Sequence, residues 1–186
     1  MSYDAGLLVL RLTVGLLLAA HGSQKLFGWF GGAGFTRMAQ NTERMGLRPG
    51  WFWATLAAVS EFGGGLALAL GLLMPLPAVG IVAAMAIAVL KVHWKNGFWN
   101  SKGGIEYPLS LLLVAATLGL IGAGRFSVDA LLGLHLPEAP VFWLGLLAAL
   151  ITIGVGVVMG ARKPAHAPSA PSSPSSPSPQ SGQRAH

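Results

Sequence analysis

The sequence predicts an all-α fold: a polytopic membrane helix bundle with a four-helix core and a fifth transmembrane helix. Of the 186 residues, 53% are apolar and 10% are charged, whereas an ordinary soluble domain carries about a quarter charged residues. The mean hydropathy is +0.63. The apolar residues fall in long blocks and do not alternate with polar ones, which indicates that lipid is the main solvent of the chain.

Five apolar segments account for the predicted crossings. A hydrocarbon layer of about 30 Å requires about 20 helical residues. The first segment contains Arg11 and Lys25, but each lies toward one end, where a long cationic side chain reaches the lipid headgroups. The segments cover residues 5–30, 52–74, 78–92, 105–122 and 141–161.

Composition divides the chain into three parts. Residues 1–132 form the predicted four-helix core, and residues 133–163 add a C-terminal transmembrane helix. Residues 164–186 hold six prolines and seven serines with few apolar side chains, which predicts a disordered tail. His166 and His186 belong to this tail and are assigned no role.

Prolines and glycines predict how the helices pack. Pro75 and Pro77 separate the second and third segments, which therefore form a tight antiparallel hairpin. Small residues allow membrane helices to approach each other closely. Glycines of this kind recur in the first two segments, at Gly15, Gly22, Gly28, Gly63, Gly64, Gly65 and Gly71.

The composition excludes two kinds of function. The chain has no cysteine, which excludes disulfides and thiolate chemistry. Its net charge of +6 forms no basic stripe with interleaved aromatics, so no nucleic-acid partner is expected.

The distribution of the cations predicts the orientation of the chain. With five crossings, Arg125 lies alone on one side of the membrane. The other side is predicted to be cytoplasmic, with the N-terminus outside and the C-terminus inside. Its cations are Arg37, Arg44, Arg48, Lys95, Lys102, Arg162, Lys163 and Arg184.

Ionisable side chains of four segments converge at this cytoplasmic end. A charge within a membrane segment is costly unless it is paired or hydrated, so each one is a candidate for a site. Glu61 lies about nine residues, or roughly 13 Å, inside the second segment, too deep to reach the headgroups easily, and His21 or Lys25 is its expected partner. The candidate catalytic residues are Glu61, His21 and Lys25, and the candidate substrate-binding residues are His93, Glu106 and Lys91.

A smaller polar group is predicted at the opposite end. Arg11 lies inside the first segment, and Asp129 follows the fourth. We expect these two side chains to form a structural ion pair, because a guanidinium and a carboxylate satisfy each other's charge and hydrogen bonds.

Six short motifs, in order along four predicted helices, resemble those of the DoxX family over residues 7–132. The resemblance implies a four-helix core in the bacterial inner membrane and an association with quinone-linked oxidation and with oxidative or thiol stress. The fifth helix and the tail lie outside the family pattern. The motifs are Arg11-Leu12 with Gly15; residues 21–28; Glu61 with Gly64, Gly65 and Gly71; His93 with Gly97-Phe98; Gly104 with Glu106-Tyr107; and residues 122–129.

The first functional hypothesis is a membrane subunit of a quinone-linked redox or stress system. His21, Lys25 and His93 would donate hydrogen bonds to the carbonyls of a bound quinone, while Glu61 would carry protons. The chain shows no flavin or dinucleotide fingerprint, so we expect a soluble redox partner protein to supply electrons and no cofactor within the chain besides a bound quinone. Independently of this hypothesis, a second copy of the chain is a candidate partner, in a homo-oligomer.

Two other hypotheses remain open. A proton-coupled carrier for a small molecule would use the same cationic cluster as its binding site, and a non-catalytic assembly subunit would use it only to lock the bundle. His21 and His93 could ligate a haem or, together with Glu61 and Glu106, a single metal ion. Histidines that are simply hydrogen-bonded are the stronger interpretation, so no metal is predicted. No motif assigns an enzymatic reaction.

Overall fold

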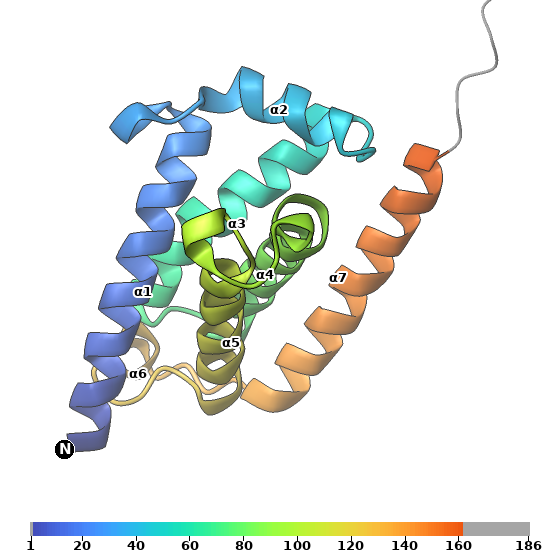
Figure 1. Cartoon of the computed structure of the whole chain (residues 1–186). Helices are drawn as coiled ribbons and strands as arrows, with labels where there is room; N and C mark the ends of the chain where they lie inside the picture. Colours follow the sequence, from blue (N-terminus) through green and yellow to red (C-terminus); the bar gives the residue numbers. More distant parts are fainter. Residues whose placement is uncertain (1, 162–186) are drawn as a thin grey trace, which may run out of the picture.

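The computed structural model describes residues 2–161, so the predicted disordered tail, with His166 and His186, lies outside the described residues. Residues 2–161 form helices joined by turns, and no strand occurs among them. Five long helices run along the molecule (Figure 1). They are α1 (Ser2–Leu26), α3 (Gly50–Leu70), α4 (Pro75–Ile87), α5 (Glu106–Ile121) and α7 (Glu138–Ala161).

Within residues 2–161, four stretches of helix are long and apolar enough to cross a membrane, which confirms an all-α polytopic bundle. They are Ser2–Leu26, Gly50–Leu70, Pro75–Asn96 and Glu138–Met159. The other apolar helix, α5, has 16 residues and is therefore about 24 Å long, short of a layer of about 30 Å. It packs against α4 and α7 within the bundle.

Two shorter helices cover the ends of the bundle. α2 (Gly34–Arg44) lies across one end, and α6 (Val128–Leu132) lies at the other, near the start of α1 (Figure 1). Neither was expected as a helix. In α2 the spacing of Phe35, Met38 and Ala39 at i, i+3 and i+4 is the signal that would have indicated it.

Close backbone contact joins α1 to α3. A Cβ atom added at Gly15 would lie 2.5 Å from the Gly65 carbonyl oxygen, and one added at Gly22 would lie 2.3 Å from the Phe62 backbone nitrogen. The predicted packing through small residues is therefore confirmed at Gly15, Gly22 and Gly65. Gly28 and Gly71 serve differently, because each ends a helix in the left-handed conformation, with φ of 73° and 68°.

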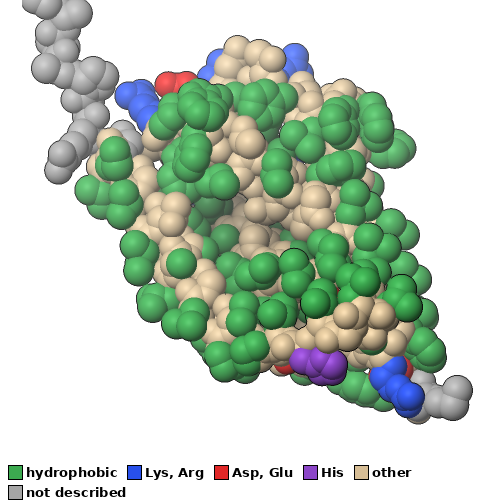
Figure 2. Space-filling view, turned by 180° about the vertical axis from the view of Figure 1, so that it is seen from behind, with side chains coloured by type: hydrophobic (Ala, Val, Ile, Leu, Met, Phe, Trp, Pro, Cys, Tyr) green, Lys and Arg blue, Asp and Glu red, His purple; other side chains and the backbone are tan. Residues whose placement is uncertain are grey.

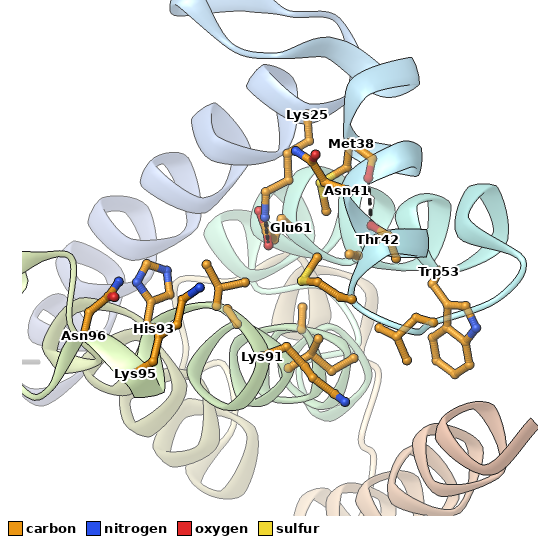
Figure 3. A pocket seen from close by; sticks show the side chains of 17 residues that line it. Lys25, Met38, Asn41, Thr42, Trp53, Glu61, Lys91, His93, Lys95 and Asn96 are labelled. Atoms are coloured by element: carbon orange, nitrogen blue, oxygen red, sulfur yellow. Dashed lines mark hydrogen bonds and ion pairs between the residues drawn. The ribbon is translucent and has the colours of Figure 1, made fainter. Parts of the chain in front are cut away.

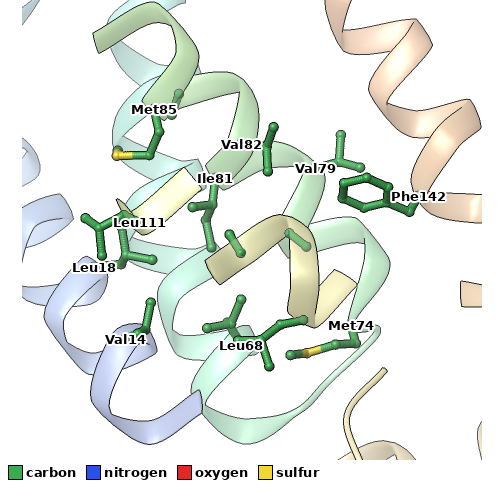
Figure 4. Packing of buried hydrophobic residues seen from close by; sticks show 14 of the residues in the cluster. Val14, Leu18, Leu68, Met74, Val79, Ile81, Val82, Met85, Leu111 and Phe142 are labelled. Atoms are coloured by element: carbon green, nitrogen blue, oxygen red, sulfur yellow. The ribbon is translucent and has the colours of Figure 1, made fainter. Parts of the chain in front are cut away.

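The predicted hairpin of the second and third segments is formed by α3 and α4. Pro75 is the first residue of α4, a position where the missing N–H costs no helical hydrogen bond. The core then lies between α1, α3, α4 and α5, with Leu18, Leu68, Ile81 and Leu111 buried in it (Figure 4). Phe142 of α7 is 1% exposed and joins the same cluster, which attaches α7 to the bundle.

The surface matches the predicted charge pattern. In Figure 2 the Lys, Arg, Asp, Glu and His side chains lie at the two ends of the molecule, and the band between them is apolar or uncharged. α2 and the segments after α4 carry Arg37, Arg44, Lys95 and Lys102, whereas Arg125 follows α5 at the opposite end. Arg162, Lys163 and Arg184 lie outside the described residues.

Among residues 2–161, Arg11 and Asp129 form no direct ion pair, although Asp129 is the carboxylate that acts electrostatically on Arg11. Arg11 is fully buried and donates a hydrogen bond to the Phe126 carbonyl oxygen. Asp129 accepts hydrogen bonds from the backbone N–H groups of Leu73 (2.8 Å) and Met74 (3.4 Å) instead. These groups lie where α4 begins and have no partner within that helix, so they compete with the guanidinium for the carboxylate.

Candidate functional site

A cavity of about 610 Å³ lies at the cation-rich end of the bundle (Figure 3). α2 covers it with Met38, Asn41 and Thr42, and α3 forms one wall. Most of the lining is apolar, and the polar and charged side chains come from several elements. The charged and imidazole side chains in the lining are Lys25, Glu61, Lys91, His93 and Lys95.

The Lys25 and Glu61 side chains form an ion pair in this cavity, with Lys25 Nζ donating to Glu61 Oε1. The structure thus gives Lys25, not His21, as the partner of Glu61. The two ends of the pair differ in exposure: the Lys25 side chain is 30% exposed and the Glu61 side chain 2%. The carboxylate therefore lies in the interior, whereas the lysine side chain is partly exposed.

The second carboxylate oxygen of Glu61 lacks a hydrogen-bond partner among residues 2–161. Glu61 Oε2 is buried, and none of these residues donates a hydrogen bond to it. A buried polar atom left without a partner costs about 1–3 kcal/mol, so native proteins supply one, as a bound water, a ligand or a proton. Because Glu61 lines the cavity, that partner has room to bind there.

His93 enters the cavity wall from a local irregularity in the third apolar segment. α4 continues as a π-helical segment, η2 (Ala88–His93), which is followed by the short turns η3 (Trp94–Asn96) and η4 (Asn100–Lys102). Such π segments occur frequently at functional sites. Lys91 and His93 of η2 both line the cavity.

One hydrogen bond fixes the tautomer of His93. Its Nδ1 lies 2.6 Å from the Gly103 carbonyl oxygen. A carbonyl oxygen only accepts, so Nδ1 carries the proton, and Nε2 of the neutral ring is an acceptor. The pocket therefore combines a lysine donor with two candidate proton acceptors, Glu61 Oε2 and His93 Nε2.

The structure places His21 and Glu106 outside the cavity lining. The Tyr107 hydroxyl lies 2.7 Å from His21 Nε2, which joins α1 to the start of α5. Glu106 Oε2 accepts a hydrogen bond of 2.9 Å from the Asn100 backbone nitrogen, which orders the loop before α5. Of the six predicted site residues, Lys25, Glu61, Lys91 and His93 share the cavity.

Several lining residues were missed from the sequence. Asn41 and Thr42 lie on α2, which falls outside the five predicted segments, and Trp53 was not among the predicted site residues. Trp53 is 6% exposed, in contrast to the other tryptophans near this end. Its position eight residues before Glu61, with Ala57 halfway between, was the available signal, because residues four apart share a helix face.

The described residues hold no cluster that suggests a metal centre. Over residues 2–161, no three His, Asp or Glu side chains come together in a way that could bind an ion. His21 and His93 each have the separate partners given above.

The comparisons with known proteins agree with the architecture. The family model DoxX matches residues 6–94, which run from α1 to the end of η2 and the first residue of η3. No curated protein and no solved structure matches the chain. The expected resemblance extended to residue 132, and its part beyond residue 94 stays a prediction. The match over residues 6–94 supports an integral membrane protein of the DoxX family.

Proposed function

We propose that the cavity binds the ring of a membrane quinone and that the chain serves as the quinone-binding subunit of a redox or stress-response system. The observation that carries this proposal is the buried, unpartnered Glu61 Oε2 beside the Lys25 ammonium group in a largely apolar cavity. A quinone needs an apolar slot, a donor for its carbonyl oxygen and an acceptor for the hydroxyl formed on reduction. The volume of about 610 Å³ falls within the usual range for small-molecule pockets.

The residues of the pocket suit both redox states of the ring. One N–H of Lys25 is used by Glu61 Oε1, and its other hydrogens are available to a quinone carbonyl. After two electrons and two protons convert the quinone to a quinol, one hydroxyl would donate to Glu61 Oε2, and the same oxygen can deliver or receive a proton. Electrons would come from a soluble partner protein that docks at this end of the bundle.

The position of the cavity suits a ligand from the bilayer. It lies at the cation-rich end, beside the apolar band that covers the middle of the molecule (Figure 2). We propose that this end faces the cytoplasm of a bacterial cell, because positively charged loops are retained there. The N-terminus would then lie outside the inner membrane.

Photolabelling with an azido-substituted ubiquinone analogue tests the proposal. The expected cross-links fall on peptides that contain residues 53–61 and 84–96, and an excess of decylubiquinone prevents them. Glu61→Gln removes the carboxylate charge at constant size, and we expect at least a tenfold loss of labelling. The matched control Glu43→Gln changes an exposed glutamate of α2 that does not line the cavity, and labelling should persist. Cross-links spread over the lipid-facing surface, with no competition, would contradict the proposal.

A carrier for a small anion is the second candidate function, and the cationic side chains of the cavity favour it. Lys91, His93 and Lys95 line the cavity in addition to the Lys25–Glu61 pair. In vesicles that contain the protein, a carrier would show anion uptake driven by a proton gradient and abolished in Glu61→Gln. Labelling by the quinone analogue without any uptake supports the first proposal over this one. If Glu61→Gln only lowers stability, a role in assembly explains the pair.

A further inference from the structure

Three residues one turn apart form the α3 wall of the cavity. Trp53, Ala57 and Glu61 are spaced by four and all line it, so they lie on one face of the helix. The Trp53 indole is 6% exposed, and its Nε1 donates a long hydrogen bond of 3.4 Å to the Arg48 carbonyl oxygen. In Figure 3 it lies at the opposite side of the cavity from His93 and Asn96.

Helix α7 contacts this indole at Gly156. Gly156 is buried, although its neighbours Val155 and Val158 are exposed. A Cβ atom added at Gly156 would lie 1.9 Å from Cζ2 of Trp53 and 2.5 Å from its Cη2. One turn of α7 thus rests directly on the ring. Among residues 2–161, no other atom lies within 4 Å of a Cβ added at Gly154, two residues earlier.

We infer that Trp53 determines which ligands fit the cavity and that Gly156 of α7 positions its indole. The fifth helix, which lies outside the DoxX match at residues 6–94, thereby becomes part of the wall of the site. Any side chain at position 156 overlaps the ring in its present position, and we expect the ring to be the part that moves. The inference concerns the pocket of the proposed function but not the identity of its ligand, so the two can fail separately.

A single cysteine in the cavity measures this effect without a known ligand. The natural chain has no cysteine, so Ala57→Cys provides one thiol, between Trp53 and Glu61. Its reaction rate with a water-soluble methanethiosulfonate reagent is measured on the purified full-length protein. We expect Gly156→Leu in this background to change the rate at least fivefold, because the displaced indole alters the space beside position 57.

Matched variants separate this effect from a general disturbance of α7. Gly154→Leu adds the same side chain where nothing opposes it, and its rate should stay within twofold of the parent. Adding Trp53→Ala to Gly156→Leu removes the overlap, so the double variant should react at the rate of Trp53→Ala alone. Gly156→Ala, which adds only the Cβ atom, should shift the rate in the same direction as leucine.

Two results would overturn the inference. An unchanged rate in Gly156→Leu would mean that α7 moves away and leaves the indole in place. Equal changes in Gly154→Leu and Gly156→Leu would mean that α7 acts on the bundle as a whole. A change specific to position 156 and cancelled by Trp53→Ala supports the inference, even if the protein binds no quinone.

Discussion

Lys25 and Glu61 differ in how firmly the fold fixes them, and this difference matters for their chemistry. Glu61 lies on α3 with its side chain 2% exposed, whereas Lys25 comes from the last turn of α1 and stays 30% exposed. When a ligand or a proton binds Glu61, the lysine can interact with solvent or lipid headgroups instead. The buried carboxylate cannot, so we expect its removal to change the site most.

A double-mutant cycle should measure this asymmetry. Removing Glu61 by Glu61→Leu leaves a lysine that can reach solvent, whereas Lys25→Met leaves a buried carboxylate without its cation. We expect Lys25→Met to destabilise the protein by about 2–4 kcal/mol, since an uncompensated buried charge is costly. Lys25→Met combined with Glu61→Leu should recover most of that loss. Thermal unfolding in detergent is the measurement, and equal effects of both single changes would contradict the asymmetry.

At the level of residues, depth along each helix was predictable from the sequence and side-chain direction was not. Counting residues from the helix ends placed Lys25, Glu61, Lys91 and His93 at one end, where the structure has them. The same count placed His21 there, but its ring bonds to Tyr107. The direction of a side chain depends on the rotation of its helix, which is set by the packing of neighbouring helices. The predicted membrane segments carry apolar residues on every face, so their sequence does not define this rotation.

The contact between α1 and α3 is the most extensive one between helices of the described residues. It depends on glycines, which have no side chain to keep the two backbones apart. Gly15 and Gly22 on α1 each allow the α3 backbone to come within contact distance. Between membrane helices, such close approach replaces the hydrophobic drive that holds soluble helices together. It also carries Lys25 to Glu61, because both residues lie near this interface.

Gly22→Ala should therefore weaken the bundle and disturb the pair. The added Cβ atom would lie 2.3 Å from the Phe62 nitrogen, so the helices must separate, at a cost of about 1–3 kcal/mol as for other overpacked sites. Gly6→Ala is the matched control in the same helix, because nothing lies near its Cβ position. Melting temperatures of the two variants give the comparison. A Gly22→Ala protein as stable as Gly6→Ala would show that the contact is unimportant.

The elements that were not predicted from the sequence are short and leave little trace in the pattern of apolar residues. α2 has 11 residues and α6 has 5, and neither contains an apolar block. The π-helical segment η2 leaves no trace in the hydropathy of the third segment, because the extra residue per turn alters only the backbone. Of these elements, α2 supplies the cover of the cavity and η2 supplies the His93 side chain.

For the whole molecule, the separation of charges toward two ends predicts the orientation in the membrane. Residues on α2 should face the cytoplasm and residues on α6 the outside. Gln40→Cys and Leu131→Cys place single thiols at exposed positions on these helices. In spheroplasts, a membrane-impermeant maleimide should label Leu131→Cys at once and Gln40→Cys only after permeabilisation. The reverse pattern would invert the topology and place the cavity at the outer face.

The central claim is that the Lys25–Glu61 pair forms the base of a quinone-binding pocket, and native membranes offer its most direct test. The protein and its Glu61→Gln variant are purified from the same host in mild detergent, and the bound small molecules are extracted and identified by mass spectrometry. The account predicts quinone in near-stoichiometric amount with the natural protein and at least a tenfold depletion with the variant. Equal trace amounts in both preparations, at the level of bulk membrane lipid, would contradict it.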